Sequence, residues 1–408
     1  MELTNLNSFL KYGYYLNYNN PDINLDLSGI NKEKYKDKNE QELIDTGLKL
    51  WKETIDDLFN TNNEHVIPLS GGVDSRAILA TLLDFTEADN IYTYTFGTPG
   101  SLDYEIGNYV ARKAGTNHKA FPLNKYIFTV DKELDYARRI DCQTFLFHHP
   151  PLEEIDELFG GFNFWSGFIL GWIAGAHLPL APSKTRKEAR KKIGKHDTFV
   201  HSIKLTNIEQ NKLVDLFNSD YIDRNILSFE EQIERDNRLP KYAAPQVLYN
   251  GYNYIIPSMN KKLYTFFMSL DDIYRRHKIL LKKMFLQEYP GLFSLPEKAN
   301  FGLPLNAKKH KVLFKKIINR ARRYINNIYP FFSQPDINYL DFSKSIREKS
   351  DLRNTIYSSI MDLKRRKVID WIDIEDIWKK YINKKVDYSD ALIILASLEI
   401  HLKVGKEI

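Results

Sequence analysis

The sequence predicts a doubly wound α/β fold with a mostly helical C-terminal region, on three observations. Short apolar segments typical of strands alternate with amphipathic segments typical of helices. A glycine-rich turn, Ser70–Arg76, stands between the first such strand and the helix after it. The chain is 43% hydrophobic and 27% charged, which is a globular composition. Alternation of this kind is typical of a parallel sheet that binds ligands at the carboxyl ends of its strands.

The individual elements follow from the period of the apolar residues. We predict helices over 41–58, 76–83, 103–113 and 132–140, and strands over 65–69, 91–96, 118–121 and 162–166. Further on, residues 230–290 are predicted to be helical, with 274–285 as the clearest amphipathic helix, 308–323 as a basic helix and 391–402 as an apolar one. Residues before 41 show little periodicity. The expected divisions are a linker-like segment 1–50, a central domain 51–310 and a helical region 311–408.

The stretch 159–183 contains no charged residue and is long enough to suggest a membrane helix. Several glycines, Asn163, His177 and two prolines argue against a span. We favour a buried strand that runs into a glycine-rich turn, and keep a single membrane helix as the alternative.

Composition excludes some classes of protein. With 58 Lys and Arg against 53 Asp and Glu, the net charge of +5 does not require a nucleic-acid partner. The basic run 184–196 is interpreted as a solvated helix face rather than an RNA contact. Cys142 is the one cysteine, so we expect a buried thiol and neither an internal disulfide nor a cysteine-rich zinc site. Because the N-terminus lacks the pattern of a secretory signal, we expect a cytoplasmic protein without a membrane partner.

The turn Ser70–Arg76 has the chemistry of an anion site. Gly71 and Gly72 can adopt backbone angles closed to other residues and leave their N–H groups uncovered, while Ser70 and Ser75 add hydroxyls at a helix N-terminus. Asp74 would be repelled by bare phosphate, so its presence favours a divalent cation that bridges it to the phosphates. A polar turn capped by Ser70 or Asp74 is the structural alternative. The first hypothesis is a bound magnesium nucleotide.

The turn has neither the Walker lysine nor the dinucleotide Gly-x-Gly-x-x-Gly spacing. It resembles the SGG-x-DS loop of the ATP pyrophosphatases. Three further strings, 96–103, 278–285 and 295–302, are similar to motifs of the synthetase domain of asparagine synthetases and β-lactam synthetases. The resemblance spans roughly residues 65–310 and implies an adenine nucleotide α-hydrolase-like sheet.

This resemblance implies an ATP-dependent ligase that adenylates a carboxylate, releases pyrophosphate and passes the acyl group to an amine. ATP and Mg²⁺ are the implied cofactors, with Asp74 on the metal and Lys278 and Lys298 as catalytic residues that neutralise the leaving group. The implied nucleotide contacts are Leu69, Ser70, Gly71, Gly72, Asp74, Ser75, Arg76, Phe96, Gly97, Asp103, Ser166 and Gly167.

The sequence also departs from the family pattern. It begins Met1-Glu2, without the nucleophilic cysteine of glutamine-dependent members and without room for their glutaminase domain before the loop. Residues 7–30 resemble the tail that links glutaminase to synthetase, so we expect the segment 1–50 to be a remnant of that link. The expected nitrogen donor is therefore ammonia, an amine, or the product of a separate amidotransferase subunit.

Other departures concern acidic residues. The segment Ser166–Gly175 offers no carboxylate, with Trp172 near the expected metal ligand, and Asn253 and Asn260 stand where the family has a glutamate and an aspartate. Asparagine cannot accept a proton at neutral pH. Two alternatives to the ligase follow: a catalytically silent nucleotide-binding scaffold, and an RNA-modifying ATP pyrophosphatase that uses the basic segments 184–195 and 308–323.

Overall fold

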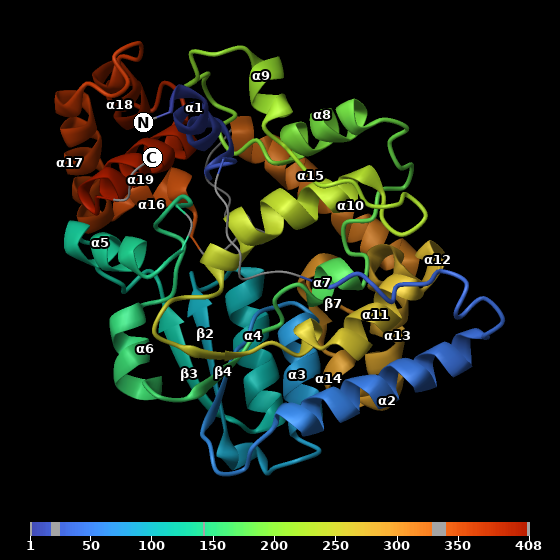
Figure 1. Cartoon of the computed structure of the whole chain (residues 1–408). Coiled ribbons are helices and arrows are strands. Elements are labelled where there is room, and N and C mark those ends of the chain that lie inside the picture. Colours follow the sequence, from blue (N-terminus) through green and yellow to red (C-terminus); the bar gives the residue numbers. More distant parts are fainter. Residues whose placement is uncertain (1, 18–24, 142, 329–339, 406–408) are drawn as a thin grey trace.

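The computed structural model describes residues 2–17, 25–141, 143–328 and 340–405, and all but five of their side chains (Figure 1). Five strands form one sheet in the order β3-β2-β1-β4-β5, and all neighbouring pairs are parallel. The strands are β1 His65–Pro68, β2 Ile91–Gly97, β3 Asn117–Pro122, β4 Asn163–Trp165 and β5 Asn253–Ile255. The doubly wound α/β fold is confirmed.

The central strands β1, β2 and β4 are buried on both faces. Val66 and Phe164 contribute to a cluster with the helix α6, Leu152–Phe159, whereas Ile67 and Trp165 contribute to the large core on the opposite face. Side chains alternate between faces along a strand, so neighbouring residues enter different cores. The helices α3 Asp74–Leu82 and α4 Leu102–Ala114 pack on the strands. The helix α2, Glu40–Leu58, packs on α3, and α5, Val130–Arg138, packs on the C-terminal helix Ser389–Lys403. All were predicted to within a few residues.

The uncharged stretch 159–183 forms the strand β4, a turn and the short helix α7, Leu170–Ile173. This is the buried strand and glycine-rich turn that the sequence favours. Within the described residues, no helix is both long and apolar enough to cross a membrane.

The prediction of helices over 230–290 is wrong for β5, Asn253–Ile255, which pairs with β4. Otherwise the middle of the chain consists mainly of short helices. They are α8 Arg186–His196, α9 Gln210–Asp215, α10 Phe229–Ile233, the π-helical segment Glu234–Ala243, α11 Lys261–Ser269, α12 Asp272–Arg275, α13 Ile279–Glu288 and α14 Pro290–Phe293. A two-stranded antiparallel hairpin, β6 Pro296–Glu297 and β7 Leu303–Pro304, follows them.

The prediction of one amphipathic helix over 274–285 is wrong. The chain breaks between α12 and α13, where His277 and Lys278 have left-handed φ values of 56° and 59°. Such angles interrupt helical hydrogen bonding. The break turns Lys278 toward the turn after β1, where its ammonium group meets Asp74.

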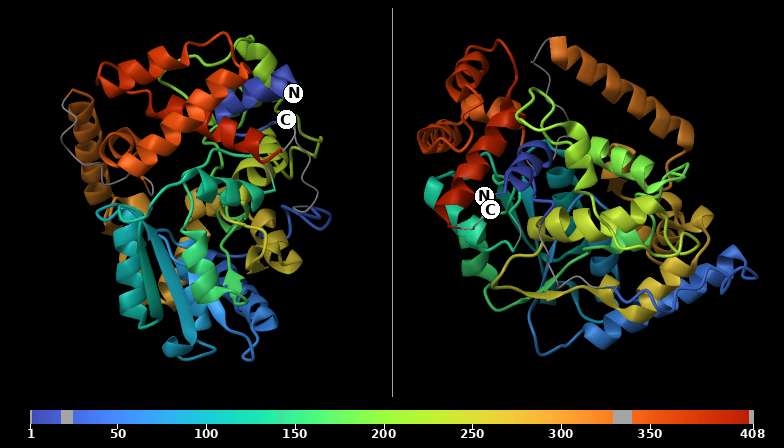
Figure 2. Two further views of the ribbon diagram at one scale, coloured as in Figure 1. Left: turned by 90° about the vertical axis from the view of Figure 1, so that its left-hand side faces the viewer. Right: turned by 45° about the horizontal axis from the view of Figure 1, so that its top comes forward.

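The C-terminal region is helical, as predicted, with α15 Lys309–Ile328, α16 Phe342–Glu348, α17 Ser350–Arg366, α18 Ile374–Ile382 and α19 Ser389–Lys403. The helix α1, Leu3–Tyr12, was not predicted; it packs against α19 and shares a hydrophobic core with the C-terminal helices (Figures 1 and 2). Its Phe9 and Leu10 are fully buried. Cys142, predicted to be a buried thiol, lies outside the described residues.

Candidate functional site

The strand order of the sheet reverses between β1 and β4. The chain proceeds from β1 to β2 and β3 on one side, and β4 and β5 lie on the other. In a doubly wound sheet, ligands bind beyond the carboxyl ends of the strands where the strand order reverses. Ser70–Ser75 follows β1 at this point, and Ser166 follows β4.

The turn after β1 leaves the N-terminus of α3 open. Val73 is the N-cap of this helix, and no side chain caps it. Neither Ser70 nor Asp74 acts as the cap, so the structural alternative for this turn does not hold. Free N–H groups at a helix N-terminus, together with the helix dipole, attract anions. The Ser75 hydroxyl instead accepts a hydrogen bond from the Ser70 amide at 3.3 Å.

The two glycines of the turn have a different role from the one predicted. Neither has a positive φ. A β-carbon on Gly71 would lie 3.1 Å from both the Leu102 carbonyl oxygen and the Lys298 β-carbon, so this glycine allows close packing. Its amide is also engaged, since it donates to Asp103 Oδ1 at 3.1 Å.

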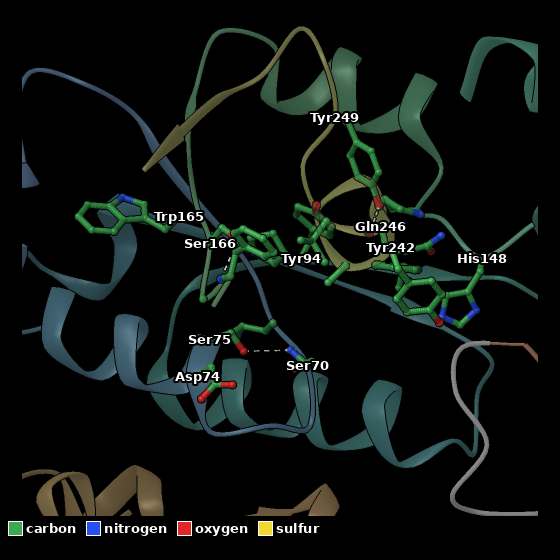
Figure 3. A pocket seen from close by; sticks show the side chains of 18 of the residues that line it. Ser70, Asp74, Ser75, Tyr94, His148, Trp165, Ser166, Tyr242, Gln246 and Tyr249 are labelled. Carbon is green, nitrogen blue, oxygen red and sulfur yellow. Dashed lines mark hydrogen bonds between the residues drawn. The ribbon is translucent and has the colours of Figure 1, made fainter. Parts of the chain in front are cut away.

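A cavity of about 430 Å³ opens beside the turn (Figure 3). Its walls include seven of the predicted nucleotide contacts: Leu69, Ser70, Asp74, Ser75, Phe96, Ser166 and Gly167. Asp74 and Ser75 border it on one side, and Tyr242, Gln246 and Tyr249 on another (Figure 3). Gly71, Gly72, Gly97 and Asp103 are not among the lining residues. The volume falls within the range for small-molecule sites.

Asp74 is paired with Lys278. The lysine Nζ donates to both carboxylate oxygens, at 3.0 and 3.1 Å, and both side chains are partly buried. Two glycines approach the same carboxylate: a β-carbon on Gly167 would lie 2.9 Å from the Asp74 β-carbon, and one on Gly171 would lie 3.4 Å from Asp74 Oδ2. The backbone of the segment after β4 therefore packs closely against Asp74.

A second lysine and carboxylate pair lies on the other side of the turn. Lys298 donates from Nζ to Asp103 Oδ2, and its backbone amide donates to the Gly71 carbonyl at 2.9 Å. Asp103 is 2% exposed. Both predicted catalytic lysines therefore contact the turn Ser70–Arg76, although they lie far from it in the sequence.

The predicted contact Arg76 also lies outside the cavity lining, and its side chain is engaged elsewhere. Its side chain is fully buried and donates to the carbonyls of Leu292, Leu295 and Pro296, at 2.7 to 3.4 Å. Burial lowers the pKa of this guanidinium to about 10, with Glu297 acting in the opposite direction. The Arg76 side chain therefore anchors the segment that leads to Lys298 and does not face the cavity.

The three residues that stand where the resembling family has acidic side chains also lie away from the cavity lining. Trp172 is packed in the core, and Gly171 is the residue that faces Asp74. Asn253 lies at the start of β5 and donates to Asn163, at the opposite end of the sheet from the turn. Asn260 caps α11 by accepting from the amides of Lys262 and Leu263. Asn253 and Asn260 are therefore structural in this fold.

The wall of the cavity opposite the turn was not predicted from the sequence. It includes His148, Arg238, Tyr242, Gln246 and Tyr249. Arg238 lies 3.4 Å from Asp197 and over the Tyr242 ring, and so brings a cation to a wall rich in aromatic groups. Burial, with Lys298 and His149 nearby, lowers the pKa of His148 to about 3, so this imidazole is neutral at pH 7. No local motif marks these residues, because only the fold brings them to the turn.

The donor set fits a nucleotide-bound magnesium ion better than a metal held by protein alone. Among the described residues, no group of three His, Cys, Asp or Glu side chains could hold a metal. Asp74 supplies one carboxylate beside the open N-terminus of α3, and Mg²⁺ commonly uses one or two carboxylates together with phosphate oxygens.

The fold and site define an α/β protein with a cavity at the switch point of a doubly wound sheet. Residues 53–140 match the family model described as asparagine synthase, which covers the span from α2 through β1, its turn and β2 to α5. This part of the chain is therefore similar to asparagine synthases. No curated protein matches the chain.

Proposed function

We propose that the protein is an ATP-dependent, amide-forming ligase that adenylates a substrate carboxylate and transfers the acyl group to ammonia or an amine. One observation carries the proposal: two lysines, each held by a carboxylate, flank an uncapped helix N-terminus that opens on a cavity. Two ammonium groups, each with a carboxylate partner, and the N-terminus of α3 thus lie around the position where the phosphates would lie.

The first step is a displacement at phosphorus. A carboxylate oxygen of the substrate attacks the α-phosphorus of ATP, the bond to the bridging oxygen breaks, and pyrophosphate leaves with the electron pair. In the second step the amine attacks the acyl carbon, AMP leaves, and the nitrogen loses a proton. The net products are an amide, AMP and pyrophosphate.

The residues around the turn have distinct roles in the first step. The α3 amides and the hydroxyls of Ser70 and Ser75 hold the β- and γ-phosphates. Lys278 and Lys298 turn from their carboxylates to the phosphates and stabilise the charge that builds on the leaving group. Asp74 would hold the Mg²⁺ of a bound nucleotide, and this ion would neutralise phosphate charge.

The far wall of the cavity supports a carboxylate substrate with an apolar or aromatic body. Arg238 offers a cation, while Tyr242 and Tyr249 offer ring surfaces and Gln246 an amide. The nitrogen donor is ammonia or an amine, either free or delivered by a separate amidotransferase subunit.

A second candidate function is a nucleotide-binding scaffold without turnover. One observation favours it: the residue that faces Asp74 from α7 is a glycine, so the site contains one carboxylate where a second would strengthen metal binding. Such a protein would bind Mg-ATP and release no pyrophosphate.

The test is release of pyrophosphate from ATP over a panel of carboxylates and amines, with AMP measured in parallel. The ligase predicts equal amounts of AMP and pyrophosphate that depend on a carboxylate. Nucleotide binding with no release over the whole panel would favour the scaffold.

A further inference from the structure

The helix α15 combines a basic face with an apolar face. Apolar residues recur at positions 313, 314, 317, 318, 321 and 325, with spacings of one to four that place them on one side of a helix. Lysines and arginines occupy much of the remaining surface, at 309, 311, 315, 316, 320 and 322. This is the pattern of a helix that lies in an interface between water and an apolar phase.

The structure presents the apolar face to solvent. Leu313, Phe314 and Ile317 are 58%, 64% and 55% exposed, whereas Asn319 is only 6% exposed. Residues two apart lie on roughly opposite sides of a helix. The helix thus turns Asn319 toward the protein and Leu313, Phe314 and Ile317 away from it. Figure 2 shows α15, the long orange helix, at the edge of the molecule.

The charge around this face is of one sign. Between Glu297 and Asp336 the sequence contains no acidic residue. The apolar face of α15 is therefore bordered by cations with no carboxylate on the same segment. An occupant of this surface has to supply both apolar material and negative charge.

We propose that α15 docks the protein on an anionic lipid surface, with Leu313, Phe314 and Ile317 inserted among the acyl chains and the lysines against the headgroups. Lipid bilayers bury apolar side chains and attract basic ones, which is the combination that this helix offers. The expectation of no membrane partner, which rested on the absence of a signal pattern and of a span, does not extend to this peripheral contact.

RNA is the alternative occupant of a basic helix, and the observations favour lipid. Nucleic acid would be held mainly by contacts between the lysines and its phosphates, and phosphates would leave Leu313 and Ile317 in water. The proposal does not depend on the ligase activity, so each can fail without the other.

The test is co-sedimentation of the full chain with vesicles of phosphatidylcholine, alone or mixed with phosphatidylglycerol. The protein is expected to sediment with the mixed vesicles and to be released by raised salt. The double variant Phe314→Gln/Ile317→Gln should weaken this partition by about tenfold or more. A matched control, Leu158→Gln/Leu180→Gln, removes apolar side chains exposed elsewhere and should partition as the native protein does.

Charge variants separate the attraction of the lysines to the headgroups from the insertion of the apolar side chains. Lys315→Gln/Lys316→Gln should weaken binding to mixed vesicles, whereas Lys187→Gln/Lys191→Gln on α8 should change it little. Failure of the native protein to bind mixed vesicles would overturn the proposal. So would equal losses in both apolar double variants, or RNA binding through the same lysines in place of vesicle binding.

Discussion

Lys278 Nζ donates hydrogen bonds to both carboxylate oxygens of Asp74, at 3.0 and 3.1 Å. The contact depends on the left-handed backbone at Lys278, which ends one helix and begins the next. The ammonium group uses one lone pair on each oxygen and would repel a metal ion that approached the same carboxylate. We therefore interpret the pair as a resting arrangement that the nucleotide and its metal open together.

Substitution of Lys298 should separate binding from turnover. Lys298→Met removes a cation from the leaving group, and loss of one such electrostatic partner typically costs about 10²- to 10³-fold in rate. ATP affinity, measured by calorimetry, should fall far less than the rate of pyrophosphate release. Lys262→Met, at an exposed lysine on α11, is the control and should change neither. Equal losses of affinity and rate in Lys298→Met would contradict a role in the leaving-group step.

Gly171 offers a way to rebuild a second carboxylate. A β-carbon there would meet Asp74 Oδ2 at 3.4 Å and Lys278 Nζ at 3.9 Å, which is ordinary contact. Gly171→Asp should therefore fold and raise the affinity for Mg²⁺ in the presence of ATP by about tenfold. Gly171→Asn has the same size without the charge. If both variants behave alike in a Mn²⁺ or Mg²⁺ titration, the position does not face the metal.

Arg76→Met should destabilise the fold. The substitution leaves the carbonyls of Leu292, Leu295 and Pro296 without a buried donor, which we expect to cost about 3 kcal/mol. Urea unfolding measures this cost. Arg138→Met, at an exposed arginine, should fall within about 0.5 kcal/mol of the native protein. If Arg76→Met kept a native-like stability but lost ATP affinity, Arg76 would belong to the nucleotide site and the structural role would be wrong.

The lowered pKa of His118 predicts that the stability of the fold depends on pH. Burial and the nearby Arg112 lower the pKa of His118 to about 4, while in the unfolded chain it lies near 6.5. The unfolded state therefore binds a proton first as the pH falls below 6.5, and stability is lost between about pH 6.5 and 4. His118→Gln should reduce the loss between pH 7 and 5 by up to about 2 kcal/mol. An unchanged pH profile in the variant would contradict the lowered pKa.

Much of the sheet and the part of the site on the turn after β1 could be predicted, because the sequence patterns that mark them are local. The strand, the Ser-Gly-Gly turn and the helix after it lie within a few residues of one another, so Ser70, Asp74 and Ser75 were found at the cavity. The pairing of Lys278 with Asp74 was not foreseen, because it requires a helix break that the amphipathic pattern of 274–285 conceals.

The rest of the site depends on tertiary contacts. Arg238 and Gln246 reach the cavity from a segment with no recognisable motif, and the fold alone brings them opposite the turn. Arg76 stands inside the motif and yet turns to the carbonyls before β6, since a motif fixes the backbone position and not the direction of each side chain. The helix α1 was missed because its apolar face is short and packs on the chain's other end.

The central claim is that Asp74 holds the metal of a bound nucleotide. Calorimetric titration of ATP with and without Mg²⁺, into the native protein and into Asp74→Asn, tests it most directly, with Asp57→Asn on the exposed face of α2 as the control. We predict Mg²⁺-dependent binding that weakens at least tenfold in Asp74→Asn and is unchanged in Asp57→Asn. Absence of ATP binding to the native protein, or equal Mg²⁺ dependence in Asp74→Asn, would contradict the account.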